Sequence, residues 1–181
     1  MLLQVHDFIS PEDCLRLLTI YDQCAAVSRT RDFSEYPVIY WNHFRSIDEM
    51  NSLTLATSSR IVNLLKDLTT EQLFPETILL TGLGPGETHP PHADNCKVDK
   101  NGEWIPNHTP WRAYSSIVYL NSDFKGGEIV FRDQEITVRP RAGLLVAFPS
   151  GRNYVHEVLP VQSGIRYTLP IWFTREREHS I

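Results

Sequence analysis

Two histidines and one aspartate of this chain have the types and spacing of a metal site. His92 and Asp94 lie two residues apart, so in extended backbone both side chains leave the same face and can reach one ion. A His-x-Asp pair alone is a weak signal, because both residue types are common in turns. The third candidate, His156, begins a strand-like segment far downstream of this pair. We predict that these three residues bind one metal ion.

The types of these ligands indicate the metal. Two histidines and one carboxylate on one face, with the opposite positions open, are diagnostic of non-haem Fe(II) oxygenases, whose open positions take a co-substrate and dioxygen. Zinc is the alternative, although a zinc site is more often closed by a fourth ligand or left with one water. His89 is a further candidate for a ligand or a substrate contact. We expect it to point away from the pair, because Pro90 restrains it to extended backbone.

An arginine in the last predicted strand could bind an anion. Alternation along this strand places Arg166 and Thr168 on one face, together with Pro170 and Trp172. Both faces would be largely apolar and buried, and a buried guanidinium needs an anionic partner. Its planar fork matches a carboxylate, and Thr168 could donate a further hydrogen bond. The alternative is that Arg166 extends to solvent or pairs with Glu157.

Short apolar runs separated by Gly, Pro, Asn and Asp follow Pro75 and predict a sheet-built region. Because no helical segment separates consecutive runs, they favour a mainly β double-stranded β-helix, or jelly roll, over an α/β fold. A jelly roll can bring distant strands together at one mouth, as the predicted metal site requires. The expected strands are 77–83, 113–120, 128–131, 135–138, 144–148, 154–159 and 165–173.

Two α-helices are expected to buttress this core from its N-terminal side. Ser10 can cap a helix that has proline at its first position and acidic residues at its positive end. Ser46 and Glu49 form a capping-box pattern that starts a second helix, which should end near Thr69. Between the helices, the aromatic and β-branched segment 36–41 predicts an extended edge segment.

The composition is that of one ordinary globular domain. The 181 residues are 41% hydrophobic and 22% charged, and we divide them into a helical buttress (1–75), a jelly-roll core (76–174) and a tail (175–181). The net charge of −5 argues against a nucleic-acid partner. Three unpatterned cysteines, an N-terminus without signal-peptide features and the lack of a long apolar run predict a cytoplasmic protein without a membrane partner.

Taken together, these motifs resemble the prolyl-4-hydroxylase-like branch of the 2-oxoglutarate and Fe(II)-dependent dioxygenases. The resemblance covers roughly residues 78–173. It rests on Gly84-Pro85-Gly86 ahead of His92-Ala93-Asp94, on Arg112, on Tyr119-Leu120-Asn121, on Gly126-Gly127-Glu128 leading to Phe131, on Pro140 and Gly143 before Phe148, and on His156-Glu157-Val158-Leu159-Pro160-Val161 followed by Gly164-Ile165-Arg166.

The resemblance implies an enzyme that hydroxylates an aliphatic C–H bond and releases succinate and CO2. The predicted metal ligands would hold catalytic Fe(II), and Arg166 would bind the distal carboxylate of 2-oxoglutarate, where the family often has lysine. The cofactors would be Fe(II), 2-oxoglutarate and O2, with ascorbate as an optional addition. The family often carries a tyrosine where this chain has Leu83, so a second hydrogen bond to 2-oxoglutarate would come from Thr168 or Tyr119.

The resemblance leaves the substrate open between a small molecule, a free amino acid and a peptide, and it leaves the oligomeric state open. The polar segment 95–111 could form a lid or substrate wall, or a packed surface loop. A noncatalytic or sensory metal-binding module, and a cupin-like isomerase or hydrolase, are alternative functions. Candidates for the substrate wall are Arg31, Tyr36, Tyr40, Trp104, Trp111 and Arg152.

Overall fold

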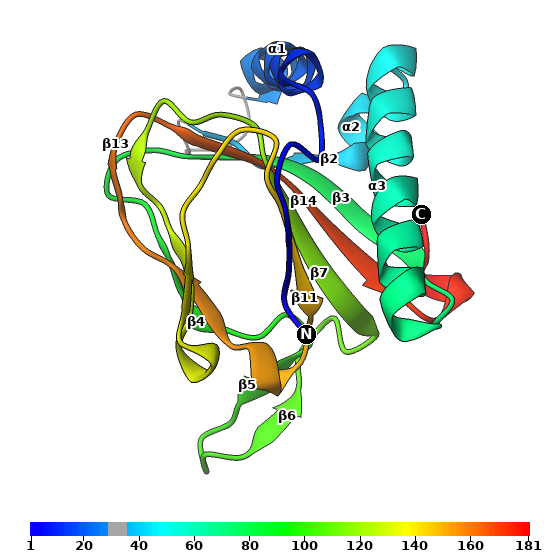
Figure 1. The fold of residues 1–181 in the computed structure, drawn as a ribbon, viewed down its shortest axis with the longest axis vertical. Coiled ribbons are helices and arrows are strands. Elements are labelled where there is room, and N and C mark those ends of the chain that lie inside the picture. The colour runs from blue at the N-terminus through cyan, green and yellow to red at the C-terminus, as the bar shows by residue number, and fades with distance from the viewer. Residues whose placement is uncertain (29–35) are drawn as a thin grey trace.

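The computed structural model describes residues 1–28 and 36–181, which form two antiparallel sheets packed face to face (Figure 1). In the large sheet the order is β1-β11-β7-β14-β3-β2, and in the small sheet it is β10-β9-β12-β4. This arrangement confirms the predicted jelly roll. The large sheet contains β1 (Leu3–Val5), β2 (Ile39–Tyr40), β3 (Phe74–Leu83), β7 (Arg112–Tyr119), β11 (Leu145–Pro149) and β14 (Arg166–Thr174), and the small sheet contains β4 (His89–His92), β9 (Ile129–Phe131), β10 (Ile136–Val138) and β12 (His156–Val158).

Shorter elements connect and extend the two sheets. A hairpin of β5 and β6 projects from one end of the molecule, and β8 pairs with β13 (Figure 1). Their bounds are β5 (Cys96–Val98), β6 (Trp104–Pro106), β8 (Lys125–Gly126) and β13 (Val161–Ser163), with single 3-10 turns at η1 (Arg132–Gln134), η2 (Arg152–Tyr154) and η3 (Arg177–His179). The hairpin falls in the segment 95–111 that the sequence leaves as a polar insertion, so this segment has regular structure of its own.

The helices α1 (Pro11–Ser28) and α3 (Asp48–Thr69) cover the outer face of the large sheet. The predicted cap of α1 is confirmed, because the hydroxyl of Ser10 accepts the backbone N–H of Asp13 at 3.0 Å. The predicted capping box of α3 is wrong. Its N-cap is Ile47, which makes no side-chain cap bond, and the acidic first turn complements the positive end of the helix dipole instead.

The N-terminal part of the chain is not purely a helical buttress. It also supplies β1 and β2, which form the two edges of the large sheet by pairing with β11 and β3. The predicted extended segment 36–41 is strand only at Ile39–Tyr40, and the chain then turns into the one-turn helix α2 (Trp41–Phe44), which the sequence does not predict. Within the described residues, no helix is both long and apolar enough to cross a membrane.

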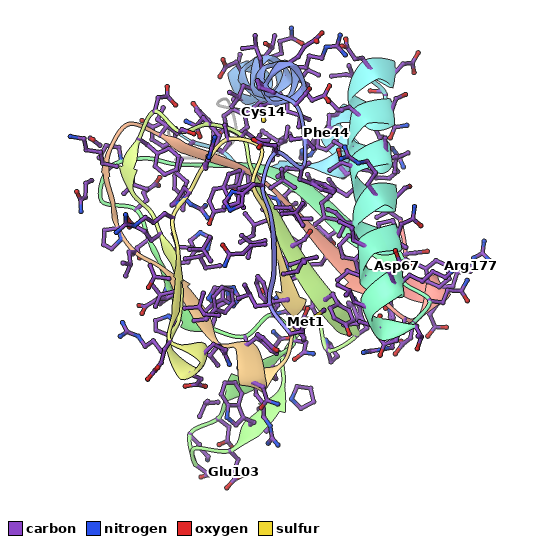
Figure 2. All side chains as sticks on the ribbon, viewed as in Figure 1. Met1, Cys14, Phe44, Asp67, Glu103 and Arg177 are labelled. Carbon is purple, nitrogen blue, oxygen red and sulfur yellow. The ribbon has the colours of Figure 1, made fainter. Side chains whose placement is uncertain are left out.

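Alternation along the strands of the large sheet gives the protein two separate interiors. The first lies between this sheet and the helices, where Leu169, Ile171 and Phe173 pack with side chains such as Cys14 and Phe44 (Figure 2). The opposite face of the same strand, from Arg166 to Trp172, turns toward the small sheet. The predicted two-sided burial of β14 is therefore confirmed.

The second interior lies between the sheets and is only partly filled by apolar side chains. Phe131 of β9 and Phe148 of β11 meet edge to face with ring centroids 4.8 Å apart, a favoured geometry for aromatic pairs. Phe148 also contacts the imidazole of His156, with centroids 4.7 Å apart. Phe148 and His156 both line a cavity that occupies the remaining space between the sheets.

Candidate active site

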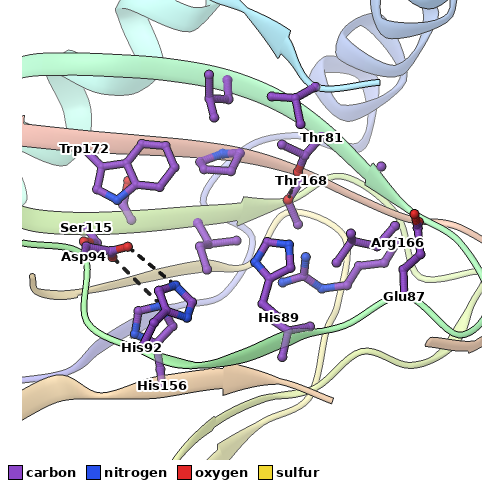
Figure 3. A pocket seen from close by; sticks show the side chains of 18 of the residues that line it. Thr81, Glu87, His89, His92, Asp94, Ser115, His156, Arg166, Thr168 and Trp172 are labelled. Atoms are coloured by element: carbon purple, nitrogen blue, oxygen red, sulfur yellow. Dashed lines mark hydrogen bonds and ion pairs between the residues drawn. The ribbon is translucent and has the colours of Figure 1, made fainter. Parts of the chain in front are cut away.

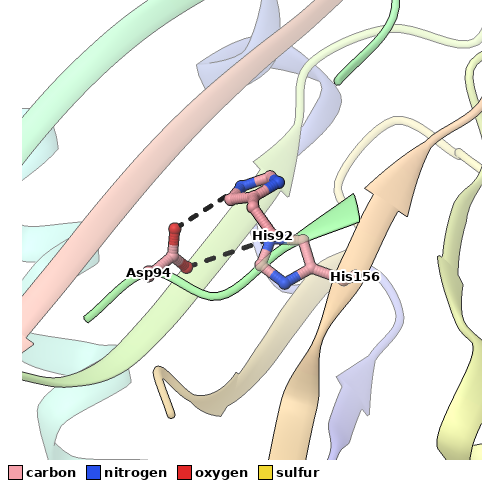
Figure 4. A group of neighbouring side chains, drawn as sticks. All are labelled: His92, Asp94 and His156. Atoms are coloured by element: carbon pink, nitrogen blue, oxygen red, sulfur yellow. Dashed lines mark ion pairs between the residues drawn. The ribbon is translucent and has the colours of Figure 1, made fainter. Parts of the chain in front are cut away.

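His92, Asp94 and His156 come together between the two sheets (Figure 4). Each offers one ligand atom, and these atoms lie within 4.8 Å of one another. His92 Nε2 is 3.7 Å from Asp94 Oδ1, and His156 Nε2 is 3.9 Å from Asp94 Oδ2. Asp94 and His156 are buried, whereas His92 is half-buried. The fold thus brings the three predicted ligands within reach of one ion.

Hydrogen bonds determine which nitrogen of each imidazole faces the aspartate. Nδ1 of His92 donates to the carbonyl of Pro90 at 2.7 Å, and Nδ1 of His156 donates to the carbonyl of Tyr154 at 3.0 Å. Because a carbonyl oxygen can only accept, each Nδ1 carries a proton, which leaves Nε2 to face Asp94. Desolvation by burial lowers the pKa of His156, although Asp94 opposes this effect. In the neutral tautomer that these hydrogen bonds favour, Nε2 of each ring is the atom that can bind a metal ion.

The carboxylate of Asp94 is held from the large sheet. The hydroxyl of Ser115, on β7, donates to Asp94 Oδ2 at 2.5 Å and lies 2.7 Å from the hydroxyl of Ser150. The backbone of Asp94 is held as well, since its N–H donates to the carbonyl of Ser150 and its carbonyl accepts the hydroxyl of Thr109. The carboxylate is thus oriented by the protein alone.

Arg166 is buried in the same cavity, with 3% of its surface exposed. Its Nε donates to the carbonyl of Gly127 at 3.0 Å, and Nη2 lies 3.4 Å from the hydroxyl of Tyr119. No carboxylate among the described residues forms an ion pair with it. Glu157, the alternative partner that the sequence leaves open, pairs with Arg132 instead. The guanidinium therefore retains N–H donors for an anion from outside the chain.

A cavity of about 280 Å³ joins Arg166 to the three clustered ligands (Figure 3). Two neighbouring strands form one of its walls, because Leu83 of β3 lies opposite Arg166 of β14 and Thr81 lies opposite Thr168. The hydroxyls of Thr81 and Thr168 are 2.7 Å apart. Tyr119 is fully buried behind Arg166 and does not line this cavity. Its contact with 2-oxoglutarate stays a prediction, since its hydroxyl lies 3.4 Å from Nη2 of Arg166.

His89 lies on the cavity wall beside Arg166, contrary to the expectation that it points away. The reason is an irregularity in the pairing of β4 with β12, where His92 pairs with His156 but His89 pairs with Val158. Four residues of β4 therefore lie opposite three of β12, and such a bulge returns a side chain to the same face. Desolvation, followed by the charge of Arg166, lowers the pKa of His89 to about 4. His89 is not part of the ligand cluster.

A second cavity, of about 670 Å³, adjoins the first on the side of the β5–β6 hairpin. His92 and Asp94 line both cavities. The hairpin contributes Val98 and Trp104, which pair across it and are 52% and 37% exposed. Val98 and Trp104 therefore form an exposed apolar wall in the cavity that His92 and Asp94 also line.

Residues 78–174 match the family model described as the 2OG-Fe(II) oxygenase superfamily. This stretch is more than half of the chain and contains the three clustered ligands and Arg166. The chain belongs to this superfamily. Membership confirms the predictions of an oxygenase and of Fe(II) and 2-oxoglutarate as its cofactors.

Curated relatives of this oxygenase include prolyl 3-hydroxylases. The chain is 46% identical over 101 residues to prolyl 3-hydroxylase 3 of Mus musculus, which covers 51% of this chain and 14% of the relative. It is 35% identical over 95 residues to prolyl 3-hydroxylase 2 of Homo sapiens, which covers 48% of this chain and 13% of the relative. The oxygenase thus spans about a seventh of the length of these relatives.

Solved structures of similar fold extend over almost the whole oxygenase. The viral collagen prolyl hydroxylase of Paramecium Bursaria Chlorella virus-1, solved as a 2OG complex, has a TM-score of 0.73 at 17% identity and covers 96% of this chain and 94% of its own. A prolyl-4-hydroxylase of Pseudomonas putida has a TM-score of 0.68 at 22% identity and covers 97% of this chain and 88% of its own. At these identities the likeness concerns the fold.

The donor atoms of the oxygenase suit its two cofactors. Two imidazoles and one carboxylate, clustered on one side of a cavity, are the donor set of non-haem Fe(II) sites. Arg166 presents a buried, unneutralised guanidinium in the same cavity, which suits one carboxylate of 2-oxoglutarate. The residues present therefore fit both groups.

The sequence assigns no role to three residues that support the site. Ser115 lies in a predicted strand without any local signal, and its role depends on Asp94 folding against it. Thr81 also lies in a predicted strand and has no local signal of a role in the site. Gly127 had a signal, the Gly126-Gly127 pair: both have positive φ, and a Cβ on Gly127 would lie 2.8 Å from Cδ of Arg166.

The candidates for the substrate wall have different positions in the oxygenase. Tyr36 lines the first cavity and Trp104 the second. Tyr40 and Arg152 line neither, and Trp111 is engaged elsewhere, because its indole donates to Glu76. Arg31 lies outside the described residues.

Proposed function

We propose that this oxygenase hydroxylates a prolyl residue of a peptide at an aliphatic C–H bond. Succinate and CO2 would be released from 2-oxoglutarate, and the reaction would take place in the cytoplasm. The relatives named prolyl 3-hydroxylases support this substrate, since one of them is 46% identical over 101 residues. The observation that carries the proposal is the common cavity of Arg166 and the clustered His92, Asp94 and His156.

In this proposal each side chain has one task. His92, Asp94 and His156 would hold Fe(II), which with O2 and 2-oxoglutarate supplies the oxidising power for the C–H bond. Ser115 keeps the carboxylate of Asp94 in place. Arg166 would bind the distal carboxylate of 2-oxoglutarate by a charge-assisted, forked interaction. The apolar wall of the first cavity excludes water from the reacting atoms.

The second cavity would receive the peptide. It is larger than the first and it begins at His92 and Asp94, so a chain bound there reaches the metal ligands. Val98 and Trp104 offer it an exposed apolar and aromatic wall, the type of surface on which peptide side chains commonly dock. The hairpin would thus act as the substrate wall that the sequence leaves open.

Two measurements test the function. Anaerobic addition of Fe(II) and 2-oxoglutarate should produce a weak visible charge-transfer band, and aerobic incubation with proline-containing peptides should release succinate while the peptide gains one oxygen atom. Asp94→Ala is the control and should show neither effect. Succinate release with free amino acids or small metabolites, but not with peptides, would overturn the peptide substrate while leaving the oxygenase intact.

The alternative functions give different results in the same measurements. A noncatalytic or sensory module would show the charge-transfer band without consuming 2-oxoglutarate. A cupin-like isomerase or hydrolase would have no affinity for 2-oxoglutarate, so Arg166→Ala would change nothing.

A further inference from the structure

The lining of the second cavity carries a positive charge that the protein does not neutralise. Lys97 of β5 is exposed and lines this cavity. Across residues 1–28 and 36–181 no carboxylate forms an ion pair with its ammonium group. Among the described lining residues the only acid is Asp94. Its carboxylate belongs to the ligand cluster and accepts the hydroxyl of Ser115, so it does not pair with Lys97.

Two arginines near this cavity differ in their charge balance. Arg112 lines the cavity, but its Nε donates to Glu76 at 3.0 Å, so this pair adds no net charge. Arg152 does not line the cavity, yet its charge acts on Cys96, which does. Desolvation raises the pKa of the Cys96 thiol, and the charge of Arg152 opposes this effect. The second cavity is therefore a positively charged region in a chain whose net charge is −5.

The position of Lys97 limits which part of a bound peptide it can contact. It lies three residues after Asp94, so the Cα atoms of these two residues are at most about 11 Å apart. An extended peptide rises about 3.3 Å per residue, so about three of its residues span that distance. When a proline lies at the metal ligands, a residue up to about three positions away can therefore lie beside Lys97.

We propose that Lys97 makes the second cavity prefer peptides that carry aspartate or glutamate within about three residues of the proline. The ammonium group attracts the side-chain carboxylate, while Val98 and Trp104 provide the apolar wall for the neighbouring side chains. Lys97 is then a specificity-determining residue and takes no part in the oxidation. This inference rests on the proposed function, because it takes a proline-containing peptide as the substrate.

The test is the binding of fluorescein-labelled synthetic peptides to the protein loaded with Mn(II) and 2-oxoglutarate, measured by fluorescence anisotropy without turnover. Each peptide has one proline in an alanine and glycine background, with Glu, Gln or Lys at one position up to about three residues away. At one or more of these positions the Kd of the Glu peptide should be roughly three- to fivefold lower than that of the Gln peptide, as for one exposed ion pair. High salt should reduce this difference.

Two charge reversals on the hairpin locate the effect. Lys97→Glu should abolish the preference for the Glu peptides and produce a preference for the Lys peptides. Lys100→Glu changes the net charge of the chain by the same amount. Because Lys100 lies in the turn between β5 and β6 and does not line the cavity, this variant should keep the preference of the wild type.

The outcomes separate this inference from the proposed function. Equal Kd values of the wild type for the Glu and Gln peptides at every position would overturn the inference alone. An equal change of preference in Lys97→Glu and Lys100→Glu would also overturn it, because the net charge and not Lys97 would then be responsible. If the wild type binds none of the peptides and adds oxygen to none of them with Fe(II) and O2, the proposed function fails as well.

Discussion

The hydroxyl of Ser115 donates to Oδ2 of Asp94 at 2.5 Å, from a strand of the sheet that faces the two histidines. Replacing Ser115 with Ala should lower the affinity for Fe(II) by about 10- to 100-fold, the usual effect of losing a group that orients a metal ligand. Competition with a metal-sensitive dye would measure this. Ser116→Ala is the control, because its hydroxyl donates to the carbonyl of Ile171. Equal affinities of the two variants would contradict the role of Ser115.

Arg166 should dominate the binding of 2-oxoglutarate. Arg166→Ala removes the buried charge that would face the carboxylate, so we expect KM for 2-oxoglutarate to rise roughly 100-fold or more. Steady-state succinate release across a range of 2-oxoglutarate concentrations measures it. Arg175→Ala is the control, because Arg175 pairs with Glu71 outside the cavity. If KM for 2-oxoglutarate hardly changes in Arg166→Ala, Arg166 does not bind the co-substrate.

The strands and the His92–Asp94 pair were predictable because their signals are local, whereas His156 had to be added from a distant part of the chain. The spacing of His92 and Asp94, and the alternation of side chains between the two faces of β14, can be read from neighbouring residues. The irregular pairing of β4 was not predictable from the sequence, because it depends on how His89 and His92 pair with β12, which lies far away along the chain. The capping box is the opposite case, because the local pattern at Ser46 is present but the N-cap of α3 is Ile47 and makes no side-chain cap bond.

Gly127 should be required for the position of Arg166. An added Cβ would lie 2.8 Å from Cδ of Arg166, and the φ of +69° is unfavourable for any other residue. Gly127→Ala should therefore destabilise the fold by about 1–3 kcal/mol and also weaken binding of 2-oxoglutarate. Gly102→Ala is a matched control, because Gly102 has φ +84° with nothing near its Cβ. Urea unfolding and calorimetry separate the two effects. Equal weakening of 2-oxoglutarate binding in both variants would argue against the contact.

Acid should destabilise the metal-free protein through His89 and His156. Both have lowered pKa values in the folded state, His89 to about 4 from an ordinary 6.5. Between these values the unfolded chain binds more protons, so the free energy of unfolding should fall as the pH drops from about 6.5 toward 4. Urea unfolding at neutral pH and near pH 5 would show it. His89→Gln should reduce the difference, and an unchanged difference would contradict this assignment.

Trp104 should contribute to the binding of the peptide and not to the binding of 2-oxoglutarate. Trp104→Ala should raise KM for a proline-containing peptide roughly tenfold, as loss of an aromatic contact does at binding surfaces, with KM for 2-oxoglutarate unchanged. Ile105→Ala is the matched control, because Ile105 is equally exposed, at 37%, but does not line the second cavity. If both variants bind the peptide like the wild type, the hairpin is not the substrate wall.

The origin of the three metal ligands has a consequence for folding. His92 and His156 belong to the small sheet, whereas the carboxylate of Asp94 is hydrogen-bonded to β7 of the large sheet. An ion held by all three would act as a crosslink between the two sheets. Metal affinity and the docking of the sheets are then thermodynamically linked, so loading with metal should raise the melting temperature of the whole domain.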